Sequence, residues 1–164
     1  MFSARQESDP DTPGVIARPP LIYGLCIALG FALDEARPNT LLAELLGGSL
    51  RWTLGGVLFS AALLAVVAAF LQFRRAGTNI DTKKTTTALV THGLYRYSRN
   101  PIYVALTAAT LAIALMAGNL WIILLLLPTL WVMQYGVVLR EEAYLTRKFG
   151  DVYRGYCGEV RRWL

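Results

Sequence analysis

The stretch THGLYRYSRNPIY, residues 91–103, brings basic, aromatic and amide side chains to the point where an apolar run begins. Asparagine is a favoured helix N-cap and proline fits the first helical turn, so the order Arg99, Asn100, Pro101 predicts a helix that starts at Pro101. The N-terminus of a helix can bind a carboxylate, and Arg99 beside it would strengthen that binding. A simpler interpretation is a capped transmembrane helix with a cytoplasmic arginine and an interfacial belt of tyrosines.

A second group, Glu141 and Glu142, directly follows another apolar run. Neither acid has a basic residue four positions away, since those positions hold Leu, Thr and Val. Acids at a membrane boundary without local partners favour a functional role. Adjacent helical positions point about 100° apart, so we expect one acid to face a site while the other hydrogen-bonds backbone or solvent. If the helix continues unbroken, one face carries Gln134, Val138, one of the acids and Leu145.

The elements that must position these groups are apolar. The chain has 164 residues, of which 55% are hydrophobic and 16% charged, which is too apolar for an ordinary soluble domain. About 20 residues cross the hydrocarbon core, so the second and fourth apolar stretches qualify, the third is close, and the first needs flanking residues. These observations predict an all-α polytopic membrane protein with about four transmembrane helices, over residues 19–33, 52–73, 101–118 and 120–139.

The third and fourth stretches are joined only around Gly118 and Asn119, so residues 101–139 should form a helical hairpin that brings the two polar groups together. Pro128 should kink its second helix. Gly150 should end that helix, and the rest of the tail either lies on the membrane or closes over a ligand. We therefore divide the chain into a mobile tail (1–18), two helices (19–76) and a core (77–164). Residues 40–50 form either a short interfacial helix or a re-entrant turn.

Charge is distributed unevenly along the chain. Residues 74–99 and residues 140–164 hold six Lys or Arg each, which places both segments and both termini on the cytoplasmic side. The net charge of +5 then reflects sidedness and attraction to membrane lipids, and a nucleic-acid partner is not expected. Two cysteines and one histidine give neither a disulfide framework nor a metal site. A cleaved signal peptide is disfavoured, because about 18 polar residues precede the first apolar run.

The segments GLYRYSRNPIY (93–103) and EEAYLTRKFGDVYRGY (141–156), with a helical hairpin between them, resemble the isoprenylcysteine carboxyl methyltransferase family and its phospholipid N-methyltransferase relatives. The resemblance covers about residues 77–163. It implies an integral membrane methyltransferase that uses S-adenosyl-L-methionine. The acceptor would be lipophilic: a prenylcysteine-type carboxylate, a phospholipid amine or a thiol. The cofactor-binding segment would be helical, C-terminal and cytoplasmic. Oligomeric state is left open.

The resemblance also implies where the donor binds. One wall would hold the methionine carboxylate through Arg99, and the other would hold the amino group or ribose through a glutamate. Arg99 and Glu142 are the residues that it makes catalytic, with Glu142 or His92 as a base if the acceptor is a protonated amine. The family commonly has histidine where this chain has Asn100, and an arginine before a Val-Pro pair where Arg161 and Arg162 here follow Val160. The implied cofactor-binding residues are His92, Tyr95, Arg99, Asn100, Pro101, Tyr103, Glu141 and Glu142.

Two other functions account for parts of the pattern. A sterol-type membrane reductase that uses NADPH has a similar C-terminal architecture, but such enzymes are usually longer, and the chain has no extra basic cluster for a 2′-phosphate. A membrane protein without catalytic activity is the other alternative. The partnerless acids and the Arg-Asn-Pro helix start argue against it.

Overall fold

The computed structural model describes residues 13–75 and 89–164, and within them the chain is helical, with no strand. The prediction of an all-α membrane protein is confirmed. Among the described residues, three helices are long and apolar enough to cross a membrane, and α4 is a shorter apolar helix. The elements are α1 (Pro19–Ala36), α2 (Leu41–Leu45), α3 (Gly48–Arg75), η1 (Gly93–Arg96), α4 (Pro101–Ala117), α5 (Leu120–Met133), the π-helical turn η2 (Gln134–Val138) and α6 (Leu139–Glu159).

Some predictions fall outside the described residues. These include the first twelve residues of the predicted tail and residues 76–88, where Lys83, Lys84 and the start of the family resemblance lie. The described part of the predicted tail, residues 13–18, lies against η2, where the Ile16 amide donates to the Gly136 carbonyl at 3.2 Å.

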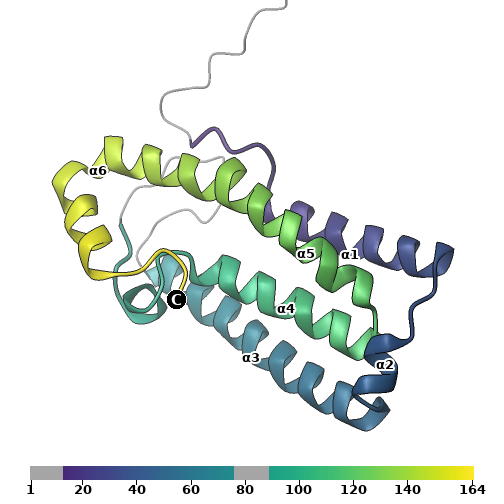
Figure 1. Cartoon of the computed structure of the whole chain (residues 1–164). Coiled ribbons are helices and arrows are strands. Elements are labelled where there is room, and N and C mark those ends of the chain that lie inside the picture. The colour runs from purple at the N-terminus through teal and green to yellow at the C-terminus, as the bar shows by residue number, and fades with distance from the viewer. Residues whose placement is uncertain (1–12, 76–88) are drawn as a thin grey trace, which may run out of the picture.

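Helix α4 lies in the middle of the bundle (Figure 1). It packs along α3 and also contacts α5 and α1, while α1 runs beside α5. Small side chains make this possible, because Ala105, Ala112 and Ala114 of α4 are all almost completely buried and let neighbouring helices approach closely. Residues 40–50, predicted as a short helix or a turn, contain α2 and the first turn of α3.

The predicted hairpin is present. Asn119 joins α4 to α5: its Oδ1 accepts from the Ile122 amide at 3.1 Å, which caps α5, and its Nδ2 donates to the Gly30 carbonyl of α1 at 3.1 Å. Asn119 is 1% exposed, so both bonds form away from water. The hairpin turn and α2 lie at one end of the bundle, and η1, α6 and the C-terminus lie at the other (Figure 1).

The second helix of the hairpin departs from the predicted course at η2 and again after Gly150. It runs through Pro128 and then widens into η2, so the unbroken α-helical face proposed for Gln134, Val138 and the acids is wrong. At Gly150, where the helix was predicted to end, the backbone has a non-helical φ of 54° and ψ of −126°, and the helix direction changes. Helical structure then resumes as far as Glu159, which turns the end of α6 back toward η1 (Figure 1).

Candidate active site

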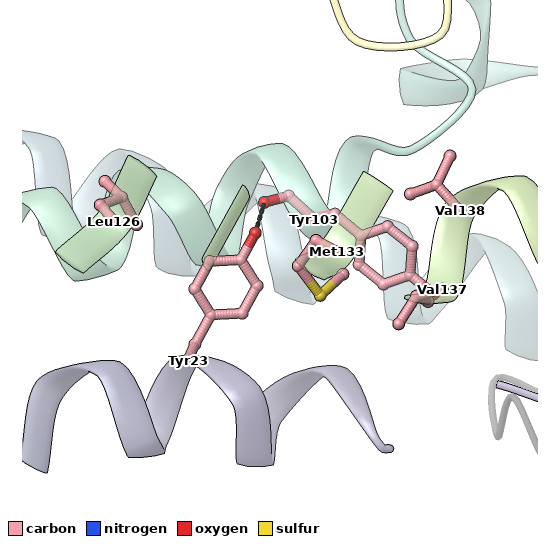
Figure 2. Close-up of a cluster of buried hydrophobic side chains, with 6 residues drawn as sticks. All are labelled: Tyr23, Tyr103, Leu126, Met133, Val137 and Val138. Atoms are coloured by element: carbon pink, nitrogen blue, oxygen red, sulfur yellow. Dashed lines mark hydrogen bonds between the residues drawn. The ribbon is translucent and has the colours of Figure 1, made fainter. Parts of the chain in front are cut away.

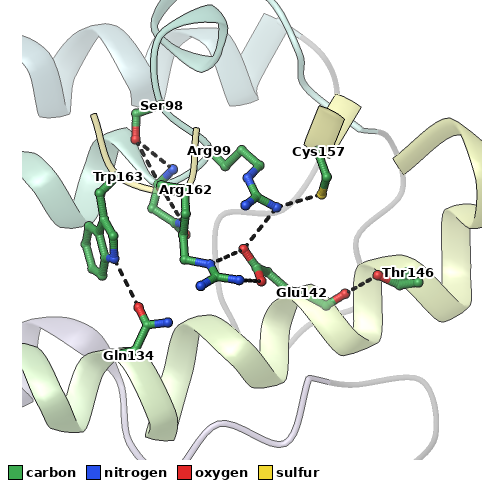
Figure 3. A network of polar contacts seen from close by, with 9 residues as sticks. Ser98, Arg99, Gln134, Glu142, Thr146, Cys157, Arg162 and Trp163 are labelled. Carbon is green, nitrogen blue, oxygen red and sulfur yellow. Dashed lines mark hydrogen bonds and ion pairs between the residues drawn. The ribbon is translucent and has the colours of Figure 1, made fainter. Parts of the chain in front are cut away.

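Two arginines converge on Glu142 at the end of the bundle where α4 begins (Figure 3). Arg162 donates from Nε and Nη2 to the two carboxylate oxygens at 2.9 and 2.8 Å, and Arg99 Nη1 lies 3.1 Å from Oε1. The side chains of Arg99 and Glu142 are only 11% and 15% exposed, whereas that of Arg162 is 37% exposed. The predicted absence of a helical partner for Glu142 is therefore correct, because its partners come from distant parts of the chain.

The C-terminal segment, residues 160–164, crosses the start of α4 and supplies Arg162. The Arg99 amide donates to the Arg161 carbonyl at 2.9 Å, and the Ser98 hydroxyl donates to the Arg162 carbonyl at 3.4 Å. Asn100 occupies the N-cap position and Pro101 begins α4, as predicted. The Asn100 side chain does not cap the helix, however: its Nδ2 donates to the Arg162 carbonyl at 3.0 Å. Residues 160–164 thus lie over the N-terminus of α4, where a ligand site was predicted.

Glu141 has a different environment from Glu142. Its Oε1 accepts from the Tyr103 hydroxyl at 2.7 Å. Tyr103 is 8% exposed and belongs to a buried cluster with Tyr23, Met133, Val137 and Val138 (Figure 2). The two acids therefore have different partners, and the expectation that one would hydrogen-bond backbone or solvent is wrong. Both carboxylates are bound by side chains from other elements.

Tyr95 connects the elements that surround the site. It is 7% exposed, packs edge-on against Phe73 with ring centroids 5.4 Å apart, and its carbonyl accepts from the Tyr156 hydroxyl at 2.7 Å. The last bond fixes the far half of α6 on η1. That half also brings Cys157 to Arg99, with Arg99 Nη1 donating to Sγ at 2.6 Å.

His92 lies outside this group. Its side chain is exposed at the start of η1, and no hydrogen bond or ion pair joins it to the other described residues. The structure therefore brings together Arg99, Asn100, Pro101, Tyr103, Glu141 and Glu142, and Tyr95 holds α6 through its bond to Tyr156.

Sequence reasoning missed three contributors to this group. Arg162 was assigned no role, and neither Cys157 nor Tyr156 was singled out. Arg162 lies 20 residues from Glu142, beyond any helical spacing, and only the reversal at Gly150 brings it back. The sequence offered one signal for these residues: basic and aromatic residues continue after Gly150, the predicted end of the helix.

The arrangement suits a small zwitterionic ligand. Two guanidinium groups and one nearly buried carboxylate lie within hydrogen-bonding distance, so both a carboxylate and an ammonium group would find a partner. Arg99 Nε is buried and finds no acceptor among the described residues, which leaves a donor available. The hydrogen bonds to Glu142 raise the pKa of Arg162 above its usual value, so its positive charge is secure.

Comparisons with known proteins indicate the family. The family model described as phospholipid methyltransferase matches residues 50–152. The chain is similar to the protein-S-isoprenylcysteine O-methyltransferase of Schizosaccharomyces pombe (strain 972 / ATCC 24843), with 34% identity over 107 residues, 65% of this chain and 43% of that protein. It thus spans less than half of that relative's length. It is also similar to an uncharacterized Haemophilus influenzae protein, with 41% identity over 63 residues, 38% of this chain and 100% of that protein. No solved structure matches the chain.

Proposed function

The chain belongs to the phospholipid methyltransferase family, and from this we propose that it transfers a methyl group from S-adenosyl-L-methionine to a lipophilic acceptor in the membrane. The observation that carries the proposal is the convergence of Arg99, Glu142 and Arg162 where α4 and α6 meet. Residues 93–103 and 141–156, which carry the family resemblance, supply most of this group.

The residues present fit the methyl donor. Its methionine moiety carries one carboxylate and one ammonium group, and we assign the carboxylate to Arg99 and the ammonium group to Glu142. The unpaired Arg99 Nε supports the first assignment, and the low exposure of the Glu142 carboxylate supports the second. Tyr95, Asn100, Pro101 and Tyr103 would shape the same wall. His92 is the weakest of the proposed cofactor-binding residues because its side chain is exposed.

The transfer asks for alignment more than for acid or base groups. When bound, the donor supplies a methyl group on a sulfonium, which an acceptor removes by in-line displacement. Arg99 and Glu142 would fix the donor, and residues 160–164 would exclude water from it. For a protonated amine acceptor, Glu141 is a better base than Glu142, since it accepts from a neutral phenol whereas Glu142 is held by two cations.

The acceptor and the membrane side follow from the same premises. The apolar helices beside the site favour an acceptor that reaches it from the bilayer. The excess of Lys and Arg in residues 140–164 supports a cytoplasmic site with both termini on that side.

The test is calorimetric titration of the purified full chain with S-adenosylhomocysteine, with NADPH titrated in parallel. We expect saturable binding of S-adenosylhomocysteine alone. Binding of NADPH alone would replace the proposal with a reductase, and binding of neither would contradict both enzymes.

A further inference from the structure

The π turn η2 joins the membrane-spanning α5 to the helix that carries both site acids. A π turn contains one more residue than the corresponding α-helical turn, and such turns are rare and occur often at functional sites. Here Gly136, Val137 and Val138 are buried, and the two valines are 0% exposed. The turn is therefore fixed in the core near the site and is not a frayed helix end.

The extra residue changes where Glu141 and Glu142 point. Each residue of an α-helix turns the chain by about 100°, so one inserted residue rotates everything after it by that angle relative to α5. Glu141 and Glu142 lie in the first turn of α6, just after η2. Glu141 reaches Tyr103 of the neighbouring α4 at 2.7 Å, and Glu142 reaches Arg99, just before α4, at 3.1 Å. An unbroken helix would present a different face to α4 at this level.

The segment before α1 holds η2 from one side. Besides the Ile16 amide, which donates to the Gly136 carbonyl at 3.2 Å, Arg140 Nη1 donates to the Gly14 carbonyl at 2.9 Å. Val15 packs against the same buried cluster as Val137. A methyl group at Gly136 would overlap the end of the Ile16 side chain, so the Ile16 side chain would have to shift.

The C-terminal segment holds η2 from the other side. Trp163 Nε1 donates to Gln134 Oε1 at 3.0 Å, and the Trp163 side chain packs against the same buried cluster (Figure 3). Trp163 is the immediate neighbour of Arg162, which binds Glu142. The first residue of η2 and the acid beyond it are thus tied to consecutive residues of one segment.

From these contacts we infer that η2 is a positioning device for the methyl-donor site, and that Gly136 and Gln134 are its positioning residues, held by residues 13–18 and by Trp163. The inference rests on the proposed function. It assigns a role to the described part of the N-terminal segment: that segment controls donor affinity by fixing the rotation of α6.

The test is a pair of mutant cycles read by titration of the full chain with S-adenosylhomocysteine, with thermal unfolding measured in the same detergent. Gly136→Ala should weaken binding about tenfold or more, because small displacements of binding groups are costly. Adding Ile16→Ala should restore most of the affinity by removing the overlap. Gly158→Ala, in open space on α6, is the matched control and should bind as wild type does.

A second cycle uses Trp163→Phe and Gln134→Leu, which remove one hydrogen bond while keeping apolar volume. Each should weaken binding, and the double variant should be no weaker than the worse single variant, since both act through the same bond. If Gly136→Ala does not fold, this second cycle alone tests the positioning role of η2. Asn119→Ala, at the far end of the hairpin, is the destabilised control that should keep donor affinity.

The outcomes separate the two proposals. If wild type fails to bind S-adenosylhomocysteine, the proposed function is wrong and this inference falls with it. If wild type binds, and folded Gly136→Ala and Trp163→Phe bind equally well, only the positioning role is overturned. Loss of affinity in Gly136→Ala without recovery in the double variant would also overturn it, because the overlap with Ile16 would not be the cause.

Discussion

Glu142 binds two cations at the same time: Arg162 donates to both carboxylate oxygens, and Arg99 lies beside Oε1 alone. Arg162 has the better geometry, with two short parallel bonds, whereas Arg99 is the more deeply buried partner. Removing the carboxylate would leave both guanidinium groups without a counter-charge, and the cost is largest for the group that water reaches least. The site is therefore a cluster of three charged side chains with Glu142 at its centre.

We predict that Glu142→Gln weakens S-adenosylhomocysteine binding by at least about tenfold, because the amide cannot pair with an ammonium group as a carboxylate does. The free energy of unfolding should fall by roughly 1–3 kcal/mol, less than for a fully buried pair because Arg162 is partly exposed. Titration and thermal unfolding measure the two effects. Glu159→Gln, which changes an exposed acid on the same helix, is the control. Equal affinity of Glu142→Gln and Glu159→Gln for S-adenosylhomocysteine would show that Glu142 does not bind the donor.

The elements differ in how far the sequence predicts them. The apolar stretches predicted the hairpin, and the Arg-Asn-Pro order predicted the start of α4, because both depend on local chemistry. The π turn could not be predicted, since the residues that contact it, Ile16 and Trp163, lie 120 and 27 residues from Gly136. Arg162 was missed for the same reason. Gly150 was recognised as a helix end, but resumption of the helix depends on the Tyr156 contact with η1.

Gly150 is the point at which α6 changes direction and returns toward the site. We predict that Gly150→Ala lowers the free energy of unfolding by about 1–3 kcal/mol, because φ 54° with ψ −126° is a conformation that side chains resist. It should also weaken donor binding by shifting Tyr156 and Cys157. No atom lies within 4 Å of the added methyl group, so the cause is the backbone alone.

The control for this prediction is Gly155→Ala, on the same helix and also in open space. It should leave binding unchanged and stabilise the helix by about 0.5–1 kcal/mol. Thermal unfolding of the two variants side by side gives the comparison. Similar behaviour of the two would show that the turn at Gly150 carries no strain for alanine.

Asn119 should affect stability without affecting the site. Asn119→Ala removes the cap of α5 and leaves the buried Gly30 carbonyl without its partner, so we expect a loss of about 2 kcal/mol or more. Donor affinity should stay within about twofold of wild type, a change too small to signal a lost contact. Asn39→Ala removes an exposed bond to the Leu41 amide and should cost much less. A large loss of affinity in Asn119→Ala would mean that the two ends of the hairpin are coupled.

The two ends of the bundle carry different elements. The candidate site, α6 and both described terminal segments lie at one end of the bundle, and α2 and the hairpin turn lie at the other (Figure 1). The elements at the first end carry several exposed arginines: Arg96, Arg140, Arg147, Arg154 and Arg161. Because Lys and Arg favour the cytoplasmic side, this asymmetry gives the bundle an orientation that can be measured.

We predict that positions 40 and 159 lie on opposite sides of the membrane. Thr40→Cys and Glu159→Cys, each exposed, would be placed singly in a chain whose Cys26 and Cys157 are replaced by alanine and serine. A membrane-impermeant maleimide should label position 40 in right-side-out vesicles and position 159 only in inverted ones. Labelling of both from one side would mean that the helices do not cross as a bundle of four. Labelling in the reverse sense would keep the bundle but place the donor site outside the cytoplasm, away from the compartment in which the proposed donor is made available.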